Sequence, residues 1–180
     1  MKLIEKTLNT TTIFDGRIIR LTHDEVLLPN GKVSWREVVH HRGGVCVLAV
    51  NEESILLVKQ FRSPYQAVLY ECPAGKLEDS EHPQLAGKRE LEEETGAYAA
   101  CLLPLGIMYP SPGYTNEVIH LFYTENFVMG QMTLDDDEFL DVEKVLLKDA
   151  LTWIRNGKIV DAKTIIAIYR YLDLKNKILL

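Results

Sequence analysis

The stretch GKLEDSEHPQLAGKRELEEETG, residues 75–96, constrains this chain most, because it holds six glutamates in 22 residues. Its larger part is predicted to be a helix that starts at Pro83 and ends at the last glycine. On such a helix Glu90, Glu93 and Glu94 share one face. Like charges at these spacings destabilise a helix by about a few tenths of a kcal/mol per pair. A hard divalent cation, which prefers carboxylate oxygens, would offset that cost.

The spacing of this segment resembles the Nudix box, the signature of the Nudix hydrolases. The resemblance rests on Gly75, on Glu81 and on the run RELEEETG at residues 89–96. One departure is Ala97, where the pattern usually has a larger aliphatic residue that packs on the core. The resemblance implies an enzyme that cleaves a diphosphate linked to a second moiety and depends on Mg²⁺, with Mn²⁺ as a substitute ion.

The size and charge of the chain fit a small enzyme. With 180 residues and 47% hydrophobic residues, it is long enough for one domain with a real core. A formal net charge of −6 argues against a nucleic-acid partner. Because a phosphate substrate is also anionic, bound metal would have to reverse the local field.

The cysteines and the apolar runs predict a cytoplasmic protein without a membrane partner. Cys46, Cys72 and Cys101 lie far apart without zinc-like spacing, and we expect them to be small buried residues. Their odd number fits a reducing compartment. The N-terminus lacks the apolar centre of a signal peptide, and the longest apolar run, 45–50, is too short to span a membrane.

The order of predicted elements indicates an α+β fold, a Nudix-type α/β/α sandwich with mixed sheets and an N-terminal β-hairpin arm. We expect residues 1–42 to form the arm and 43–180 the Nudix domain. In the arm, Asn30-Gly31 predicts a hairpin between strands 17–28 and 33–40, which should pair with something else. The other predicted strands are 45–50, 54–60, 68–71, 103–108, 118–123 and 142–147, with a loop at 72–75; two further helices are expected at 148–156 and from the cap Asp161 to about 175.

The acidic helix face is the predicted metal site. Glu90 and Glu94 can hold one cation together, and Glu93 can hold a second cation or accept a proton. The resemblance adds the carbonyl oxygen of Ala74 as a ligand. Diphosphate hydrolysis needs exactly this kind of charge neutralisation, together with an oriented water and a base. The competing interpretation is a solvated acidic face, which the full box spacing disfavours.

Four residues are expected to support this site: Gly75, Glu81, Arg89 and Gly96. Arg89 can pair with Glu93 at i, i+4 and fix its direction. Glu81 can support the preceding turn or the outer shell of the metal, and we leave both open.

Two segments after the box resemble the ADP-ribose pyrophosphatase branch of the family. In SPGYTNE, residues 111–117, Pro112 follows Gly96 by 16 positions. The resemblance implies substrate contacts from Ser111, Pro112, Gly113 and Glu117, and a plain turn is the alternative.

The second segment is LDDDEF, residues 134–139, which resembles a mobile acidic loop. Glu138 matches a metal-linked acid. Asp136 matches a proposed base where related enzymes often have Glu, so its shorter side chain leaves the base open among Glu93, Asp136 and Glu138. Surface acidity alone is the alternative.

Arg36 and Arg62 resemble arginines of the family that contact phosphate or ribose, which suits the guanidinium fork. Each can instead be a salt-bridge partner. Trp35 and Phe14 can stack on adenine or serve in packing, and both interpretations stay open.

These features predict Mg²⁺-dependent hydrolysis of ADP-ribose to AMP and ribose 5-phosphate. The alternatives are a nucleotide-sugar or dinucleoside polyphosphate hydrolase, and a non-catalytic Nudix module that senses a nucleotide. In the resembling branch the N-terminal arm exchanges between subunits, which implies a homodimer and a partner for the hairpin.

Overall fold

A computed structural model describes residues 3–134 and 138–175, which form two compact units. The first unit comprises the chain up to residue 43 together with residues 109–118. The second comprises residues 44–108 and the chain from residue 119 onward. The loop 109–118 therefore belongs with the N-terminal arm.

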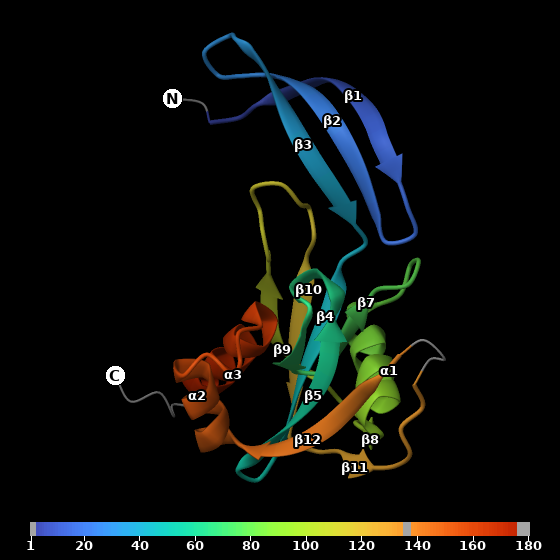
Figure 1. Cartoon of the computed structure of the whole chain (residues 1–180), viewed down its shortest axis with the longest axis vertical. Coiled ribbons are helices and arrows are strands. Elements are labelled where there is room, and N and C mark those ends of the chain that lie inside the picture. Colours follow the sequence, from blue (N-terminus) through green and yellow to red (C-terminus); the bar gives the residue numbers. More distant parts are fainter. Residues whose placement is uncertain (1–2, 135–137, 176–180) are drawn as a thin grey trace. The chain divides into compact units, whose positions relative to one another are not determined.

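The first unit contains a three-stranded antiparallel sheet of β1 (Lys6–Asp15), β2 (Ile19–Leu27) and β3 (Val33–His41), in that order (Figure 1). The predicted hairpin is confirmed: Gly31 has φ +80° and its N–H bonds the carbonyl of Leu28 at 2.9 Å. The strand β1 was not predicted from the sequence. Since β1 pairs with β2 along its length, the hairpin finds its third strand within its own chain.

The loop 109–118 is tied to β3 inside this unit. Val39 donates its backbone N–H to the carbonyl of Tyr114 at 2.7 Å, and Asn116 donates to the carbonyl of Val39 at 3.1 Å. A parallel bridge joins Val39 and Thr115. The substrate loop predicted from sequence thus continues the edge of the arm sheet.

The second unit is built on a mixed sheet in the order β12-β5-β4-β10-β9, with β6 beside β5 and β7 beside β4. The β4–β10 pair is parallel and the other pairs are antiparallel. Its strands are β4 (Gly44–Asn51), β5 (Ser54–Arg62), β6 (Ala67–Glu71), β7 (Ala74–Lys76), β9 (Leu103–Met108), β10 (Ile119–Thr124) and β12 (Leu140–Leu146). The predicted strands of this region are confirmed within one or two residues.

Four short elements differ from expectation. The segment predicted as a loop at 72–75 overlaps β7 (Ala74–Lys76), because Ala74 pairs with Cys46 of β4. A two-stranded sheet joins β8 (Ala97–Tyr98) to β11 (Val128–Met129), and a 3-10 turn, η1 (Ser63–Tyr65), follows β5. These pieces are too short to leave a periodic signal in the sequence.

The helices are α1 (Pro83–Thr95), α2 (Leu147–Arg155) and α3 (Ala162–Leu174). The predicted ends of α1 are confirmed: Pro83 is the first residue, and Gly96 caps the helix with φ +70°. The predicted cap of α3 is also confirmed, since the Asp161 carboxylate accepts the N–H of Thr164 at 2.9 Å. Within the described residues, no helix is long and apolar enough to cross a membrane.

The helices cover the two faces of the central strands, with α1 on one side and α2 and α3 on the other (Figure 1). On β4, Leu48 belongs to the core cluster that includes α3, and Val47 belongs to the cluster that includes Leu91 of α1. The α/β/α sandwich expected from sequence is therefore confirmed. Gly87 of α1 allows close packing, because a Cβ there would lie 3.2 Å from the Val47 side chain.

Candidate active site

The acidic face of α1 is turned partly into the protein. Glu94 is only 2% exposed and Glu90 8%. Glu93 lies at an intermediate depth, whereas Glu92 is exposed. Burial of two ionisable carboxylates on one helix is expensive unless they gain compensating partners.

Arg89 is the main partner of this face. Its guanidinium donates two hydrogen bonds to Glu81, both at 3.0 Å. It also donates to Glu90 Oε1 at 2.8 Å and to Glu93 Oε2 at 3.0 Å, so the predicted i, i+4 pair is confirmed. The hydrogen bonds from Arg89 lower the pKa of Glu81. Glu81 also accepts the N–H of Glu78 at 3.0 Å, so it supports the turn before α1.

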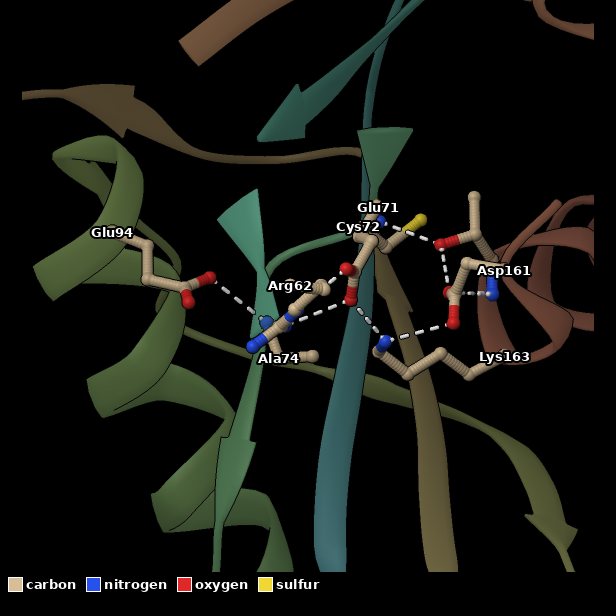
Figure 2. Close-up of polar contacts among 8 residues, drawn as sticks. Arg62, Glu71, Cys72, Ala74, Glu94, Asp161 and Lys163 are labelled. Atoms are coloured by element: carbon tan, nitrogen blue, oxygen red, sulfur yellow. Dashed lines mark hydrogen bonds and ion pairs between the residues drawn. The ribbon is translucent and has the colours of Figure 1, made fainter. Parts of the chain in front are cut away.

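The strand β7 meets α1 through two adjacent residues. The backbone N–H of Ala74 donates to Glu94 Oε2 at 2.9 Å (Figure 2). Gly75 leaves room for the neighbouring carboxylate: a Cβ there would lie 2.0 Å from Oε1 of Glu90. A glycine at this point is therefore required for Glu90 to lie where it does.

The electrostatics of the face favour added positive charge. Burial raises the pKa of Glu94 to about 8, and the charges of Glu90 and Glu138 act in the same direction, although the Ala74 hydrogen bond favours the ionised form. Burial also raises the pKa of Glu90, against the pull of Arg89. Glu138 thus lies close enough to be felt by both carboxylates.

Gly130 and Thr133 lie against the end of α1. Thr133 donates its N–H to the carbonyl of Glu93 at 3.0 Å, and Gly130 donates to the carbonyl of Gly96 at 2.6 Å. Asp136, the proposed base, lies outside the described residues.

The donor chemistry of this site fits a divalent metal ion. Carboxylate oxygens from Glu90, Glu93, Glu94 and Glu138, with the Ala74 carbonyl, are the hard ligands that Mg²⁺ takes. Buried carboxylates with raised pKa values are stabilised by a nearby cation. Within 3–134 and 138–175, no three His, Cys, Asp or Glu side chains already converge on a common point. Arg89 instead contacts Glu90 and Glu93.

Arg62 belongs to a buried ionic network next to this site (Figure 2). Its Nε donates to Glu71 Oε1 at 2.7 Å and its second nitrogen donates to Oε2 at 2.8 Å. Lys163 also contacts Oε2 of Glu71, and it bonds Asp161 at 3.0 Å. Arg62 therefore forms an ion pair with the buried Glu71, and its contact with substrate remains a prediction.

Glu71 and Lys163 were not predicted from the sequence to have a functional role. The available signal was a glutamate at the end of an apolar strand, directly before the buried turn that leads to Ala74. Such a carboxylate needs a cation, but the sequence does not say that Lys163, 92 positions away, supplies it.

The other predicted substrate residues lie in the first unit. Arg36 forms an ion pair with Glu5 through hydrogen bonds of 3.0 and 2.5 Å, and its contact with substrate remains a prediction. Glu117 lies 3.4 Å from Nδ1 of His41. Pro112 and Gly113 are exposed and Ser111 is half-buried.

Two aromatic residues of the arm stay accessible, and one cysteine differs from expectation. Trp35 stacks on His23 with ring centroids 4.6 Å apart, yet it is 50% exposed. Phe14 is also exposed. Cys46 and Cys72 are buried as expected, but Cys101 is exposed because it lies in a loop before β9 rather than in the core.

The chain matches two families along its length. Residues 40–166 match the NUDIX domain, and residues 5–39 match the nucleoside diphosphate sugar hydrolase N-terminal domain. The departure at Ala97 falls within the first match, and Ala97 is fully buried, as its packing role requires.

Curated relatives cover nearly the whole chain. It is 47% identical over 176 residues to the ADP-ribose pyrophosphatase of Bacillus subtilis (strain 168). The aligned residues cover 96% of this chain and 95% of that protein. It is 43% identical over 174 residues to a methanol dehydrogenase activator of Bacillus methanolicus, covering 95% and 94%. A GDP-mannose pyrophosphatase of Yersinia enterocolitica is 33% identical over 144 residues, covering 74% and 75%.

The fold is also found in a crystal structure of an ADP compounds hydrolase, with a TM-score of 0.84, 17% identity and 97% of both chains covered. At that identity the likeness concerns the fold alone. The family match and the curated relatives together show that the chain belongs to the Nudix family and is a Nudix pyrophosphohydrolase.

Proposed function

We propose that this protein hydrolyses the diphosphate bond of ADP-ribose to AMP and ribose 5-phosphate with Mg²⁺. The likeness to the Bacillus subtilis ADP-ribose pyrophosphatase along 96% of the chain supports this substrate. The N-terminal match to nucleoside diphosphate sugar hydrolases points to the same class of molecule.

Five groups of this chain would hold the metal: the carbonyl of Ala74 and the carboxylates of Glu90, Glu93, Glu94 and Glu138. When bound, the cation neutralises the charge of the diphosphate and lowers the pKa of the attacking water. The chain contributes the fixed position of these oxygens. Gly75 leaves the space that the Glu90 carboxylate occupies, and the Ala74 N–H directs Glu94.

The base that orients or deprotonates the water is proposed among Glu93, Asp136 and Glu138. Glu93 has a side chain that is 40% exposed, so water reaches it, and its contact with Arg89 fixes its direction. Glu138 is close enough to affect both buried carboxylates. A general base must lie within hydrogen-bond reach of the water that it deprotonates, and this requirement is what the proposal sets for the chosen carboxylate.

The substrate is proposed to contact Arg62 through its phosphates. The Arg62 side chain is 36% exposed, and its positive charge acts to lower the pKa of Glu94. The Arg62 guanidinium therefore lies next to the acidic site. From the first unit, Arg36, Glu117 and the loop residues Ser111, Pro112 and Gly113 are proposed to contact the ribose and phosphate groups.

The observation that carries this proposal is the burial of Glu94 on the Nudix helix, with a raised pKa and a backbone partner. Glu94→Gln keeps the shape and an acceptor for Ala74 but removes the charge that would hold a metal. We expect turnover of ADP-ribose to fall by about 100-fold or more, with the unfolding midpoint nearly unchanged. Product AMP is measured by chromatography with Mg²⁺ and with a chelator.

Glu92→Gln is the matched control, because it removes the same charge from the exposed face of α1. It should retain full turnover. Wild-type turnover in Glu94→Gln with Mg²⁺ present would refute the metal assignment.

The second candidate function is hydrolysis of a nucleotide sugar, which the likeness to a GDP-mannose pyrophosphatase favours. A panel of ADP-ribose, GDP-mannose and dinucleoside polyphosphates, with kcat/KM for each, separates the candidates. Tight ADP-ribose binding without any Mg²⁺-dependent product would instead indicate a nucleotide sensor.

We also propose a homodimer assembled through the N-terminal arm in the cytoplasm. All ten residues of β1 are exposed, including Leu8, Ile13 and Phe14. A strand with that much exposed apolar surface suits a second copy of the chain. Light scattering on the full chain should give twice the mass of 20.5 kDa, and a monomer at micromolar concentration would refute the proposal.

A further inference from the structure

The carboxylate of Glu71 lies at the end of β6 and is only 2% exposed. It has two cationic partners that come from different elements. Arg62, at the end of β5, occupies both oxygens, at 2.7 and 2.8 Å. Lys163, in the first turn of α3, contacts Oε2. The two partners outweigh the effect of burial and lower the pKa of Glu71 to about 2.

The start of α3 is tied to the same place by a second set of bonds. Asp161 accepts from Lys163 at 3.0 Å and from the hydroxyl of Thr164 at 2.6 Å. That hydroxyl in turn accepts the backbone N–H of Cys72 at 2.7 Å. Two consecutive residues, Glu71 and Cys72, are therefore held by two residues of one helix turn, Lys163 and Thr164.

This network of Arg62, Glu71, Asp161 and Lys163 is connected to the proposed active site in two ways. Along the chain, Cys72 precedes Ala74 by two positions, and Ala74 holds Glu94. Through space, the guanidinium of Arg62 lies between Glu71 and the α1 side of the site, and its charge is felt by Glu94 (Figure 2). Arg62, Glu71, Lys163 and Asp161 carry two positive and two negative charges, so their formal charges cancel.

Neutralisation of Glu71 does not by itself require Lys163, because Arg62 already forms a bidentate pair with it. The lysine adds a third bond from another direction, at the oxygen that Arg62 also uses. A carboxylate bonded from two sides cannot rotate without breaking a charged hydrogen bond. The Arg62 guanidinium, which is hydrogen-bonded to this carboxylate, is therefore held in place as well.

We propose that Lys163 is a positioning residue for hydrolysis, acting through Glu71 to hold the Arg62 guanidinium toward the substrate diphosphate. This inference rests on the proposed function in one respect, the contact between Arg62 and the diphosphate. Without the ammonium group, Glu71 and Asp161 lose their shared cation. The Glu71 carboxylate then gains rotational freedom and Arg62 moves with it.

The test is a double-mutant cycle on kcat/KM for Lys163→Met and Arg62→Met, using the substrate that the wild-type enzyme hydrolyses best in the panel above. We expect Lys163→Met to lower kcat/KM by about tenfold or more. In the Arg62→Met background, Lys163→Met should lower kcat/KM by less than about twofold, because Arg62, through which Lys163 acts, is gone. Lys163→Arg should recover most of the loss.

Lys158→Met is the matched control. Lys158 also lies near β6, with its ammonium over the rings of Tyr70 and Trp153, but its charge faces aromatic rings rather than Glu71. It should retain kcat/KM within about twofold. Equal losses in Lys158→Met and Lys163→Met would reduce the effect to general electrostatics and overturn the proposal.

A second readout uses metal-free protein and no substrate. The Nε–H of Arg62 donates to Glu71, so this proton should exchange slowly with water. Its ¹H–¹⁵N signal is assigned by its absence in Arg62→Lys. We expect exchange about tenfold faster or more in Lys163→Met, measured well below the unfolding temperature. Should that variant not fold, Lys163→Gln takes its place in both measurements.

The outcomes separate this inference from the proposed function. Absence of hydrolysis across the panel would overturn the proposed function, and the exchange rate would still decide the positioning role. Unchanged exchange in Lys163→Met, or a cycle in which the two losses add, would overturn the positioning role while leaving hydrolysis intact.

Discussion

The fit of Gly75 against Glu90 gives the sharpest prediction about this site. A Cβ at residue 75 would lie 2.0 Å from Oε1 of Glu90, where ordinary contact begins at 3.4 Å. In Gly75→Ala the carboxylate must therefore retreat by about 1.4 Å, and displacement of a reacting group by about 1 Å costs on the order of 100-fold in rate. We expect kcat/KM with Mg²⁺ to fall by about 100-fold.

The stability of Gly75→Ala should change much less than its activity. Gly75 does not have a positive φ, so alanine can adopt its backbone conformation. Crowding costs about 1–3 kcal/mol, and the reduced freedom of the unfolded chain returns about 0.4–1 kcal/mol. Thermal unfolding should therefore move down by only a few degrees while metal-ion affinity, measured by calorimetry, weakens.

Gly130→Ala is the control for this test, because a Cβ there would meet only the carbonyl of Gly96, at 3.4 Å. It should have wild-type kcat/KM. A further check uses Glu90→Gln as the background. There Gly75→Ala should lower kcat/KM by less than about threefold. Wild-type activity in Gly75→Ala, or a full additional loss in the Glu90→Gln background, would refute the reasoning.

Two further predictions concern other parts of the molecule. Because Arg62 and Lys163 lower the folded-state pKa of Glu71 to about 2 from an ordinary value of 4.5, Glu71 contributes ~3 kcal/mol of stability above pH 4.5 that is lost as the pH falls toward 2. Urea unfolding of wild type and Glu71→Gln should differ by at least that amount at pH 7 and converge near pH 2; a constant difference would contradict the ion-pair account. With Trp153→Phe as background, Trp35 is the remaining tryptophan, and ADP-ribose should quench its fluorescence if its exposed ring stacks on adenine. An unchanged spectrum at saturating ligand would leave Trp35 with a packing role.

The acidic face of α1 could be predicted because its signal is local. Helix periodicity alone places Glu90, Glu93 and Glu94 together, and the capping residues at both ends fix the boundaries. The pair between Arg89 and Glu93 follows from the same periodicity. The contact of Arg89 with Glu81 was not predicted, because Glu81 lies before the first residue of the helix, where the backbone is not periodic.

The network around Glu71 could not be predicted because its partners are distant in the chain. Lys163 and Glu71 are brought together by the packing of α3 against the sheet, and single-sequence patterns do not specify such pairings. The strand β1 was missed for a different reason. Its sequence, KTLNTTTIFD, is mostly polar and fully exposed, so it lacks the alternation that marks a half-buried strand.

The contacts of the acidic helix α1 also explain how such a sequence folds before any cation binds. Arg89 places one positive charge against Glu81, Glu90 and Glu93, so these three carboxylates are only partly neutralised. Glu94 receives a backbone hydrogen bond from Ala74, and burial still raises its pKa. Glu90 and Glu94, the two carboxylates of this face whose pKa values are raised, therefore lie together next to β7. A helix that gathers these two carboxylates at one buried point, and pairs the others with Arg89, is stable enough to form and still favours a cation at that point.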